Sequence, residues 1–164
     1  GFERDTAYSL SKWMTGKDNE LICYRTQGSG SIATVRLKKG LSHKAGGDIA
    51  CLDDEYSATF RGFFQKYYID CKTVQSSDLL FIKEDAKDYL FQEWKKTLEQ
   101  CPIDKIPLMI CKIRNRRSPV IVITNKSFDK INQKIKYIFK NEQLNFELFF
   151  LNDMYSNYLW DELV

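Results

Sequence analysis

The clearest strand signal in this sequence is Tyr67-Tyr68-Ile69-Asp70-Cys71-Lys72-Thr73, in which β-branched and aromatic residues surround two charges. A second strand is predicted for Gly46-Gly47-Asp48-Ile49-Ala50-Cys51, which loop-like segments also bound. Side chains alternate between the two faces of a strand, so Asp70 and Lys72 should share a face. One face of a core strand would then carry an acid and a base.

Charges on an otherwise apolar strand are usually paired, bound to a metal or used in catalysis. Asp48 on the neighbouring strand would bring a second carboxylate to Asp70, with the Lys72 ammonium beside them. Two carboxylates suit a hard divalent cation such as Mg²⁺. The alternative is a hairpin whose charges are simply solvated, and these two strands fit both interpretations.

The length and composition predict a single domain over residues 1–164. Hydrophobic residues make up 43% of the chain and aromatic residues 14%, which is enough for a sizeable core and excludes a disordered chain. The formal net charge of +3 permits nucleic-acid binding without arguing for it.

Cysteine and histidine usage limits the possible chemistry. Five cysteines without C-x-x-C spacing predict free thiols, a reducing compartment and no zinc site. His43 is the single histidine and falls in a basic segment, which argues against a histidine metal site or a Ser-His-Asp triad. With no long apolar run and no visible secretory signal, we expect a soluble, intracellular, cytoplasmic protein without a membrane partner.

An amphipathic helix is predicted for Phe2 to Met14, with Gly16 as its stop. Glu3 falls on or beside the buried face of this helix, which is an unusual place for a charge. It is either a solvated first-turn glutamate favoured by the helix dipole or a carboxylate that reaches the metal site.

Basic residues gather in two further segments. A predicted strand at Leu21 to Thr26 leads into a Gly/Ser turn at residues 27–31, which suits either a phosphate or a plain linker, and residues 32–45 then contain no acid. The second segment, residues 112–117, is a predicted hairpin tip. Each segment is either solvated or in contact with a nucleic-acid backbone.

Apolar patterns predict a central mixed β-sheet flanked by helices. Glu84 to Cys101 has a helical stripe that includes Leu90, Trp94 and Leu98, and two nearly continuous apolar runs, Ile106 to Ile113 and Pro119 to Thr124, read as strands buried on both faces.

Two other segments are less regular. A long, elaborated hairpin is expected between Cys51 and Tyr67. The tail should contain a Lys-rich helix around Ile131 to Phe139 and an aromatic strand or helix at Phe146 to Leu151.

The order of these features resembles the archaeal-type Holliday junction resolvases and related phage-like members of the PD-(D/E)xK nucleases. That order is a helix with Glu3, a strand with Arg25, a Gly/Ser turn, Gly47-Asp48-Ile49, Asp70-Cys71-Lys72, an amphipathic helix, and then Ile106-Pro107. The resemblance covers residues 2–124 and implies an α/β, restriction-endonuclease-like core, with residues 125–164 as a C-terminal extension.

The resemblance implies a Mg²⁺-dependent endodeoxyribonuclease that also accepts Mn²⁺. Asp48, Asp70 and the backbone carbonyl of Cys71 would ligate the metal, and Glu3 would hold it through water. Lys72 would orient the attacking water and stabilise the charge that develops on the phosphorane.

DNA, branched or duplex, is the partner that the resemblance implies. Two residues fall where resolvases engage the scissile strand, Arg25 and Ser29. The further basic side chains expected to contact DNA are Lys38, Lys39, Lys44, Arg114, Arg116 and Arg117.

Several features depart from the resolvase pattern. Asp70 stands where resolvases usually have glutamate, and Gly47 replaces the proline of the motif. The basic insertion before Asp48, the long hairpin after it and the tail are not resolvase-like. These departures leave the substrate and a resolvase-style homodimer open. Two functions remain: a DNA endonuclease that acts on branched DNA, with a restriction-like or repair nuclease as its variant, or a non-catalytic nucleic-acid-binding or interaction protein on the same fold.

Overall fold

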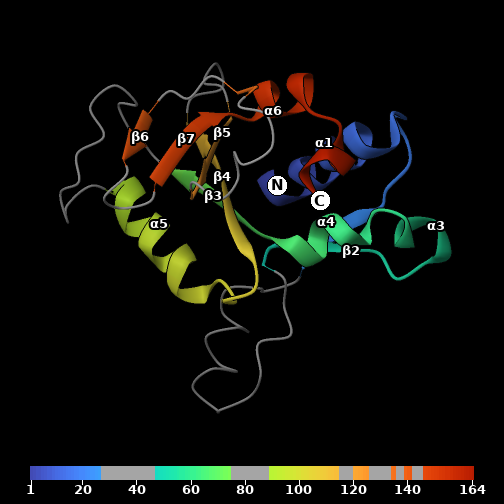
Figure 1. Ribbon diagram of the computed structural model, residues 1–164, viewed down its shortest axis with the longest axis horizontal. Helices are drawn as coiled ribbons and strands as arrows, with labels where there is room; N and C mark the ends of the chain where they lie inside the picture. Colours follow the sequence, from blue (N-terminus) through green and yellow to red (C-terminus); the bar gives the residue numbers. More distant parts are fainter. Residues whose placement is uncertain (27–46, 75–88, 115–119, 126–133, 136–138, 142–145) are drawn as a thin grey trace, which may run out of the picture.

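Figure 1 shows the protein as a computed structural model. The structure describes residues 1–26, 47–74, 89–114, 120–125, 134–135, 139–141 and 146–164. Within these ranges the chain is a mixed α/β fold in which helices cover both faces of a mixed sheet, as the sequence predicts.

The main sheet has five strands among the described residues, in the order β3-β4-β5-β7-β6. β3 and β4 are parallel, and the other neighbouring pairs are antiparallel. The helix α5 (Tyr89–Gln100) makes the crossover between the two parallel strands. The strands are β3 (Tyr67–Val74), β4 (Ile106–Ile113), β5 (Ile121–Thr124), β6 (Phe139–Asn141) and β7 (Phe146–Phe150).

A second, smaller sheet pairs β1 (Cys23–Arg25) with β2 (Ile49–Cys51) in antiparallel register. It reaches the main sheet through a parallel bridge between Gly47 and Ile69 of β3. Asp48 therefore precedes β2 in a bend rather than lying within a strand, which corrects the predicted strand over residues 46–51.

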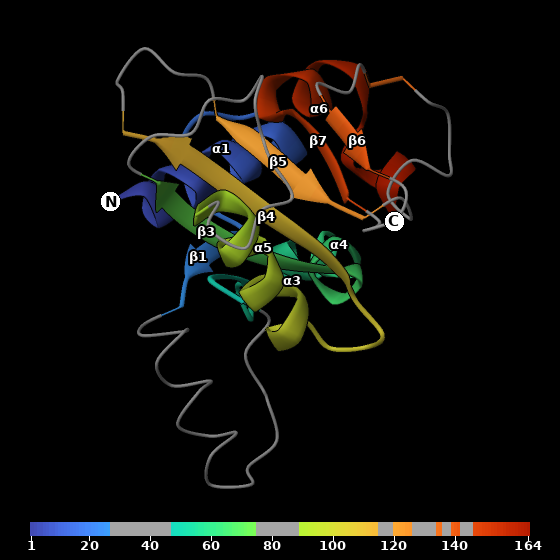
Figure 2. The same cartoon turned by 90° about the vertical axis from the view of Figure 1, so that its left-hand side faces the viewer.

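The two faces of β3 pack against different helices. Ile69 and Cys71 belong to a core that includes Leu10 of α1 (Phe2–Thr15), whereas Val74 belongs to a separate core with Trp94 of α5. Figure 2 shows α1 on the far side of the sheet and α5 on the near side. The even-numbered side chains of β3 therefore face α5.

α1 ends where the sequence predicts. Gly16 closes the helix in the left-handed conformation (φ 71°), and its N–H donates to the Lys12 carbonyl at 2.8 Å. The predicted helix over residues 84–101 is observed as α5, and residues 84–88 lie outside the described residues.

The predicted hairpin between Cys51 and Tyr67 is wrong. Two short helices, α3 (Glu55–Ala58) and α4 (Arg61–Lys66), occupy this segment. The side chain of Asp54 accepts a 2.7 Å hydrogen bond from the Ser57 N–H and so caps α3.

The tail is part of the main sheet. β7 pairs with β5, and the Tyr67 hydroxyl donates to the Leu163 carbonyl at 2.6 Å in the 3-10 helix η1 (Trp160–Leu163). The aromatic segment is observed as β7 followed by α6 (Leu151–Asn157). Phe139 begins β6, so the predicted Lys-rich helix does not include it, and most of that helix lies outside the described residues.

In the part of the chain that the structure describes, no helix has both the length and the apolar character needed to cross a bilayer.

Candidate active site

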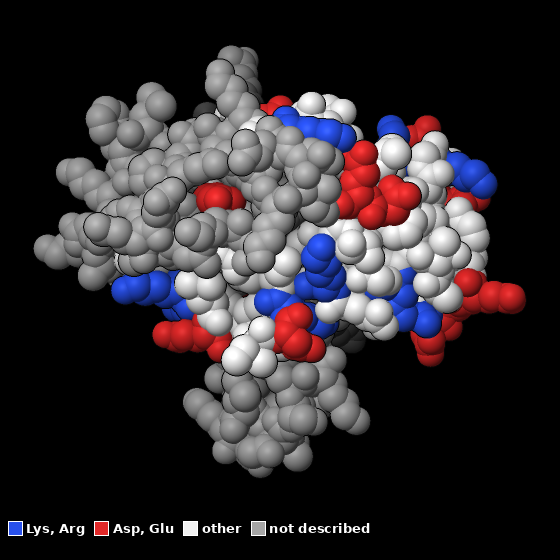
Figure 3. Space-filling view, viewed as in Figure 1, with Lys and Arg blue, Asp and Glu red and all other residues white. Residues whose placement is uncertain are grey.

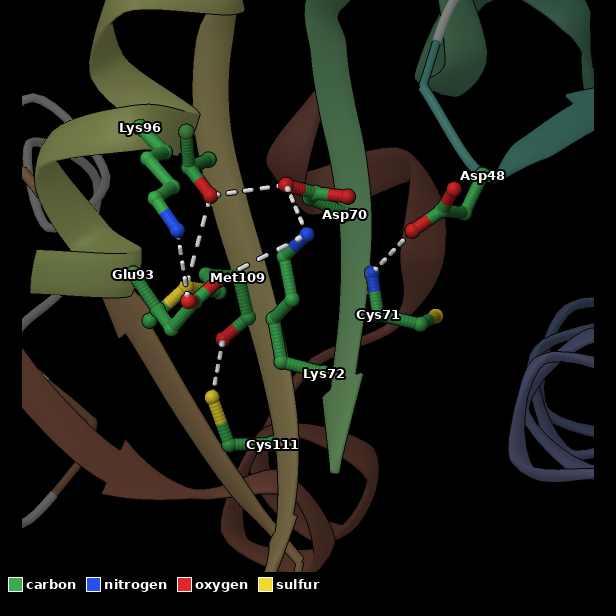
Figure 4. A network of polar contacts seen from close by, with 9 residues as sticks. Asp48, Asp70, Cys71, Lys72, Glu93, Lys96, Met109 and Cys111 are labelled. Atoms are coloured by element: carbon green, nitrogen blue, oxygen red, sulfur yellow. Dashed lines mark hydrogen bonds and ion pairs between the residues drawn. The ribbon is translucent and has the colours of Figure 1, made fainter. Parts of the chain in front are cut away.

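Asp70 and Lys72 lie on the same face of β3, as strand alternation predicts. Asp70 is buried, with 4% of its surface exposed, and Lys72 is half-buried. The Lys72 Nζ lies 3.7 Å from Asp70 Oδ2 (Figure 4). The two charges are therefore a partly buried ion pair and not a solvated hairpin.

Asp48 reaches β3 from the smaller sheet. Its N–H donates to the Ile69 carbonyl at 2.8 Å, and its Oδ2 accepts from the Cys71 N–H at 2.7 Å. Figure 4 shows the Asp48 carboxylate turned toward β3, on the side away from α5.

Gly47 allows this close approach. Its φ is +94°, and a Cβ there would lie 2.2 Å from the Ile69 carbonyl oxygen. Only glycine combines a positive φ with no side chain to clash.

Three residues of α5 complete the network, and the sequence analysis did not single them out for this role. Thr97 Oγ1 donates to Asp70 Oδ2 at 2.7 Å. Glu93 is buried and lies 3.7 Å from the Lys72 Nζ and 3.1 Å from the Lys96 Nζ. The Lys96 side chain is largely exposed.

A signal for these residues is present in the sequence. Glu93 follows Leu90 by three positions and precedes Thr97 by four, so all three share one helical face. The predicted apolar stripe continued through Thr97 to Leu98, which is 39% exposed, and did not include Glu93. A crossover helix packs on the strand it follows, and that places the polar members of its inner face beside Asp70 and Lys72.

The electrostatics of the site are strongly coupled. Burial, together with the neighbouring Asp48 carboxylate, raises the pKa of Asp70 to about 7. Burial alone would lower the pKa of Lys72, but the charges of Asp70, Asp48 and Glu93 outweigh it and raise that pKa. Lys72 is therefore a fixed cation at neutral pH.

The donor set near Asp48 and Asp70 fits a divalent cation that keeps several waters. The Asp48 carboxylate raises the pKa of Asp70, and a cation between the two carboxylates would relieve that repulsion. The N–H and C=O of one strand residue point to the same edge, so the Cys71 carbonyl faces the Asp48 side. No three His, Cys, Asp or Glu side chains of the described residues form a metal-binding group, so protein side chains alone would supply two ligands.

Glu3 lies on α1, on the opposite face of β3 from Lys72. The Glu3 charge is close enough to affect Cys71. Burial raises the pKa of the Cys71 thiol well above its usual value, and the charges of Asp48, Asp70 and Glu3 raise it further. Within the described residues, no hydrogen bond or ion pair joins Glu3 to Asp70. The role expected for Glu3, which is to hold the metal through water, stays a prediction.

Two of the predicted DNA contacts are described, and both are exposed. Arg25 pairs with Ile49 in the smaller sheet, next to Asp48, and the Arg114 N–H donates to the Val74 carbonyl at the end of β3. The remaining predicted contacts, Ser29, Lys38, Lys39, Lys44, Arg116 and Arg117, lie outside the described residues.

Charge of neither sign dominates the described part of the face in Figure 3, where basic and acidic side chains are interspersed. The site itself is therefore a stronger guide to function than the surface charge.

No family model, curated protein or solved structure matches this chain.

Proposed function

We propose that the protein is a metal-dependent nuclease that hydrolyses DNA phosphodiester bonds at Asp48, Asp70 and Lys72. The observation that carries the proposal is the Asp70–Lys72 ion pair on one face of β3, with the Asp48 carboxylate fixed beside it by the Cys71 N–H. Two carboxylates and a lysine are the groups that such a hydrolysis needs.

Lys72, Glu93 and Thr97 have separate roles in the proposed hydrolysis. Lys72 stays protonated because three carboxylates raise its pKa, so its ammonium orients the attacking water and stabilises developing negative charge rather than accepting a proton. Glu93 fixes the Lys72 side chain from α5. Thr97 fixes one oxygen of Asp70 by its hydrogen bond.

Asp48, Asp70 and the Cys71 carbonyl would hold Mg²⁺, or Mn²⁺ in its place, with Glu3 acting through water. The bound ion would supply Lewis-acid activation of the phosphate and of a water. Arg25, on the strand beside Asp48, is suited to contact the phosphates of the cleaved strand.

The order of elements supports a restriction-endonuclease-like core and a branched DNA substrate. The elements follow one another as α1, β1, β2, α3, α4, β3, α5 and β4. They bring Glu3, Arg25, Asp48 just before β2, Asp70 and Lys72 in the order on which the resemblance to the resolvases rests. A homodimer in a reducing, intracellular compartment is part of the same proposal.

Cleavage of a labelled DNA panel tests the proposal. A four-way junction, a flap, a duplex and a single strand are incubated with Mg²⁺ or EDTA and with wild type, Lys72→Ala, Asp48→Asn or the control Lys12→Ala. Lys12 is an exposed lysine of α1 that pairs with Asp18, outside the site. We expect Mg²⁺-dependent cleavage that only the first two variants lose.

The other outcomes decide among the remaining functions. Symmetric nicking of the junction supports a dimeric resolvase, whereas cleavage confined to another form keeps the nuclease and removes that substrate. DNA binding without metal-dependent cleavage of any form would overturn the nuclease and favour a non-catalytic binding protein.

A further inference from the structure

A concave site lies between α1 and the β1 segment. Its volume is about 280 Å³, at the small end of ligand pockets. Its walls are lined by Arg4 and Tyr8 from α1 and by Leu21, Tyr24 and Arg25 from the β1 segment. α1 packs against both β1 and β3, and Figure 2 shows it on the far side of the main sheet.

The walls carry exposed aromatic and cationic groups. Tyr8 and Tyr24 are 49% and 46% exposed, and Leu21 is 41% exposed. Among the described residues, Arg4 and Arg25 take part in no ion pair and no side-chain hydrogen bond. Within the part of the chain that the structure describes, two unpaired guanidinium groups therefore face the same space as two accessible rings.

The floor of this site is apolar and closed. Cys23 and Ala7 are buried, and the Cys23 thiol donates to the Ala7 carbonyl at 3.3 Å. Burial raises the pKa of Cys23 to about 12, so the thiol is neutral at physiological pH. The floor therefore supplies neither a nucleophile nor a metal ligand.

A ligand that fits these walls has a flat aromatic part and an anionic part. Tyrosine rings stack on nucleobases, and arginine forms bidentate hydrogen bonds with phosphate. The volume accommodates about one nucleotide. A base can enter only when it is not stacked in a duplex, because paired bases present only their edges.

The pocket is linked to Asp48 through β1, so one DNA strand could contact both. Arg25 lies opposite Ile49, and the next residue, Thr26, donates its N–H to the Asp48 carbonyl at 2.8 Å. On the other wall, Arg4 directly follows Glu3. A nucleotide in this site would thus neighbour a phosphate held at Asp48.

We infer that this site binds one unpaired nucleotide of the substrate strand, with its base on Tyr8 or Tyr24 and its phosphate on Arg4 and Arg25. The inference rests on the proposed nuclease function and adds a substrate class: DNA with an unpaired nucleotide next to the cleaved bond.

Binding in EDTA tests the inference without cleavage. Fluorescence anisotropy compares a labelled duplex that has one bulged nucleotide with the fully paired duplex. The proteins are wild type, Tyr8→Ala, Tyr24→Ala and Tyr24→Phe. The control is Tyr89→Ala, which removes an equally exposed ring from α5.

We expect wild type to prefer the bulged duplex, and Tyr8→Ala or Tyr24→Ala to reduce this preference by about five-fold to a hundred-fold. Tyr24→Phe and Tyr89→Ala should retain it, because both keep the stacking rings. Melting temperatures close to wild type confirm that the variants are folded, as expected for half-exposed side chains.

The arginines are tested by salt dependence. Arg4→Ala and Arg25→Ala should each lower the slope of log K against log salt by about one, which is the effect of losing one phosphate contact. Lys12→Ala, an exposed cation of the same helix, should leave the slope unchanged.

Two results would overturn the inference: a wild type that binds both duplexes equally, or a preference that survives both tyrosine-to-alanine changes. If the preference is present but no DNA is cleaved with Mg²⁺, the nuclease proposal fails and the nucleotide site stands. If DNA is cleaved and the preference is absent, only the nucleotide site fails.

Discussion

The carboxylate of Asp48 accepts a 2.7 Å hydrogen bond from the backbone N–H of Cys71, 23 residues further along the chain. β3 is an edge strand of the main sheet, so this bond and the Gly47 bridge cover part of its free edge. The position of one proposed metal ligand is thereby set by the backbone that carries the other, Asp70.

Replacing Gly47 by alanine should displace Asp48 and destabilise the fold. The new Cβ would meet the Ile69 carbonyl oxygen at 2.2 Å, in a backbone with φ +94°. We expect the free energy of unfolding to fall by about 3 kcal/mol, measured by urea denaturation. Gly16→Ala is the matched control, because Gly16 also has positive φ but nothing lies within 4 Å of its Cβ, and its loss should be about 1 kcal/mol. If both variants lost the same free energy of unfolding, the clash with the Ile69 carbonyl would not be the cause of the destabilisation.

The raised pKa of Asp70 predicts that stability falls as the pH rises. The folded protein holds the Asp70 proton up to a pH of about 7, whereas the unfolded chain releases it near pH 4. The stability this proton contributes is complete below pH 4 and is lost as the pH approaches 7, at up to about 1.4 kcal/mol per pH unit. Asp70→Asn cannot ionise, so it should remove that decline.

Urea unfolding between pH 4 and pH 8 measures the effect as the difference between wild type and Asp70→Asn. A difference that does not change with pH would mean that the pKa of Asp70 is the same in the folded and the unfolded protein.

The sequence predicted the parts of this site that depend on short-range periodicity. Alternation along β3 was sufficient to place Asp70 and Lys72 on one face, and the apolar runs were sufficient to predict β4 and β5. The mixed sheet with helices on both sides followed from the same patterns.

The parts that were missed depend on contacts between distant segments. Asp48 lies outside its predicted strand because the positive φ of Gly47 breaks the extended backbone before β2 begins. Glu93 and Thr97 belong to a helix whose rotation is set by packing on β3, which an apolar stripe specifies only to within about one residue. The two helices between Cys51 and Tyr67 are too short to show a period.

Metal binding should become stronger as the pH rises through 7. A cation must displace the Asp70 proton, so its affinity increases once Asp70 is ionised. We expect Mg²⁺ or Mn²⁺ to raise the melting temperature more at pH 8 than at pH 6. Asp48→Asn and Asp70→Asn should each abolish the shift, and Lys12→Ala should retain it. A shift of the same size at both pH values, or one that survives both aspartate variants, would place the metal elsewhere.

Glu93→Gln should weaken catalysis by releasing Lys72. Glutamine keeps the size of the side chain but loses the charge that lies 3.7 Å from the Lys72 Nζ and helps to raise the pKa of that lysine. We expect kcat for DNA cleavage to fall about tenfold with KM unchanged, since a misplaced group affects the transition state and not the binding of substrate. The pKa of Lys72, followed by NMR of its ε-carbon, should fall in the same variant, and this measurement does not depend on cleavage.

Lys96→Ala is the control, because it removes the other, largely exposed partner of Glu93 and leaves the contact with Lys72 in place. If Glu93→Gln changed neither the Lys72 pKa nor kcat, Glu93 would serve packing alone, and Lys72 would be held by Asp70 without help from α5.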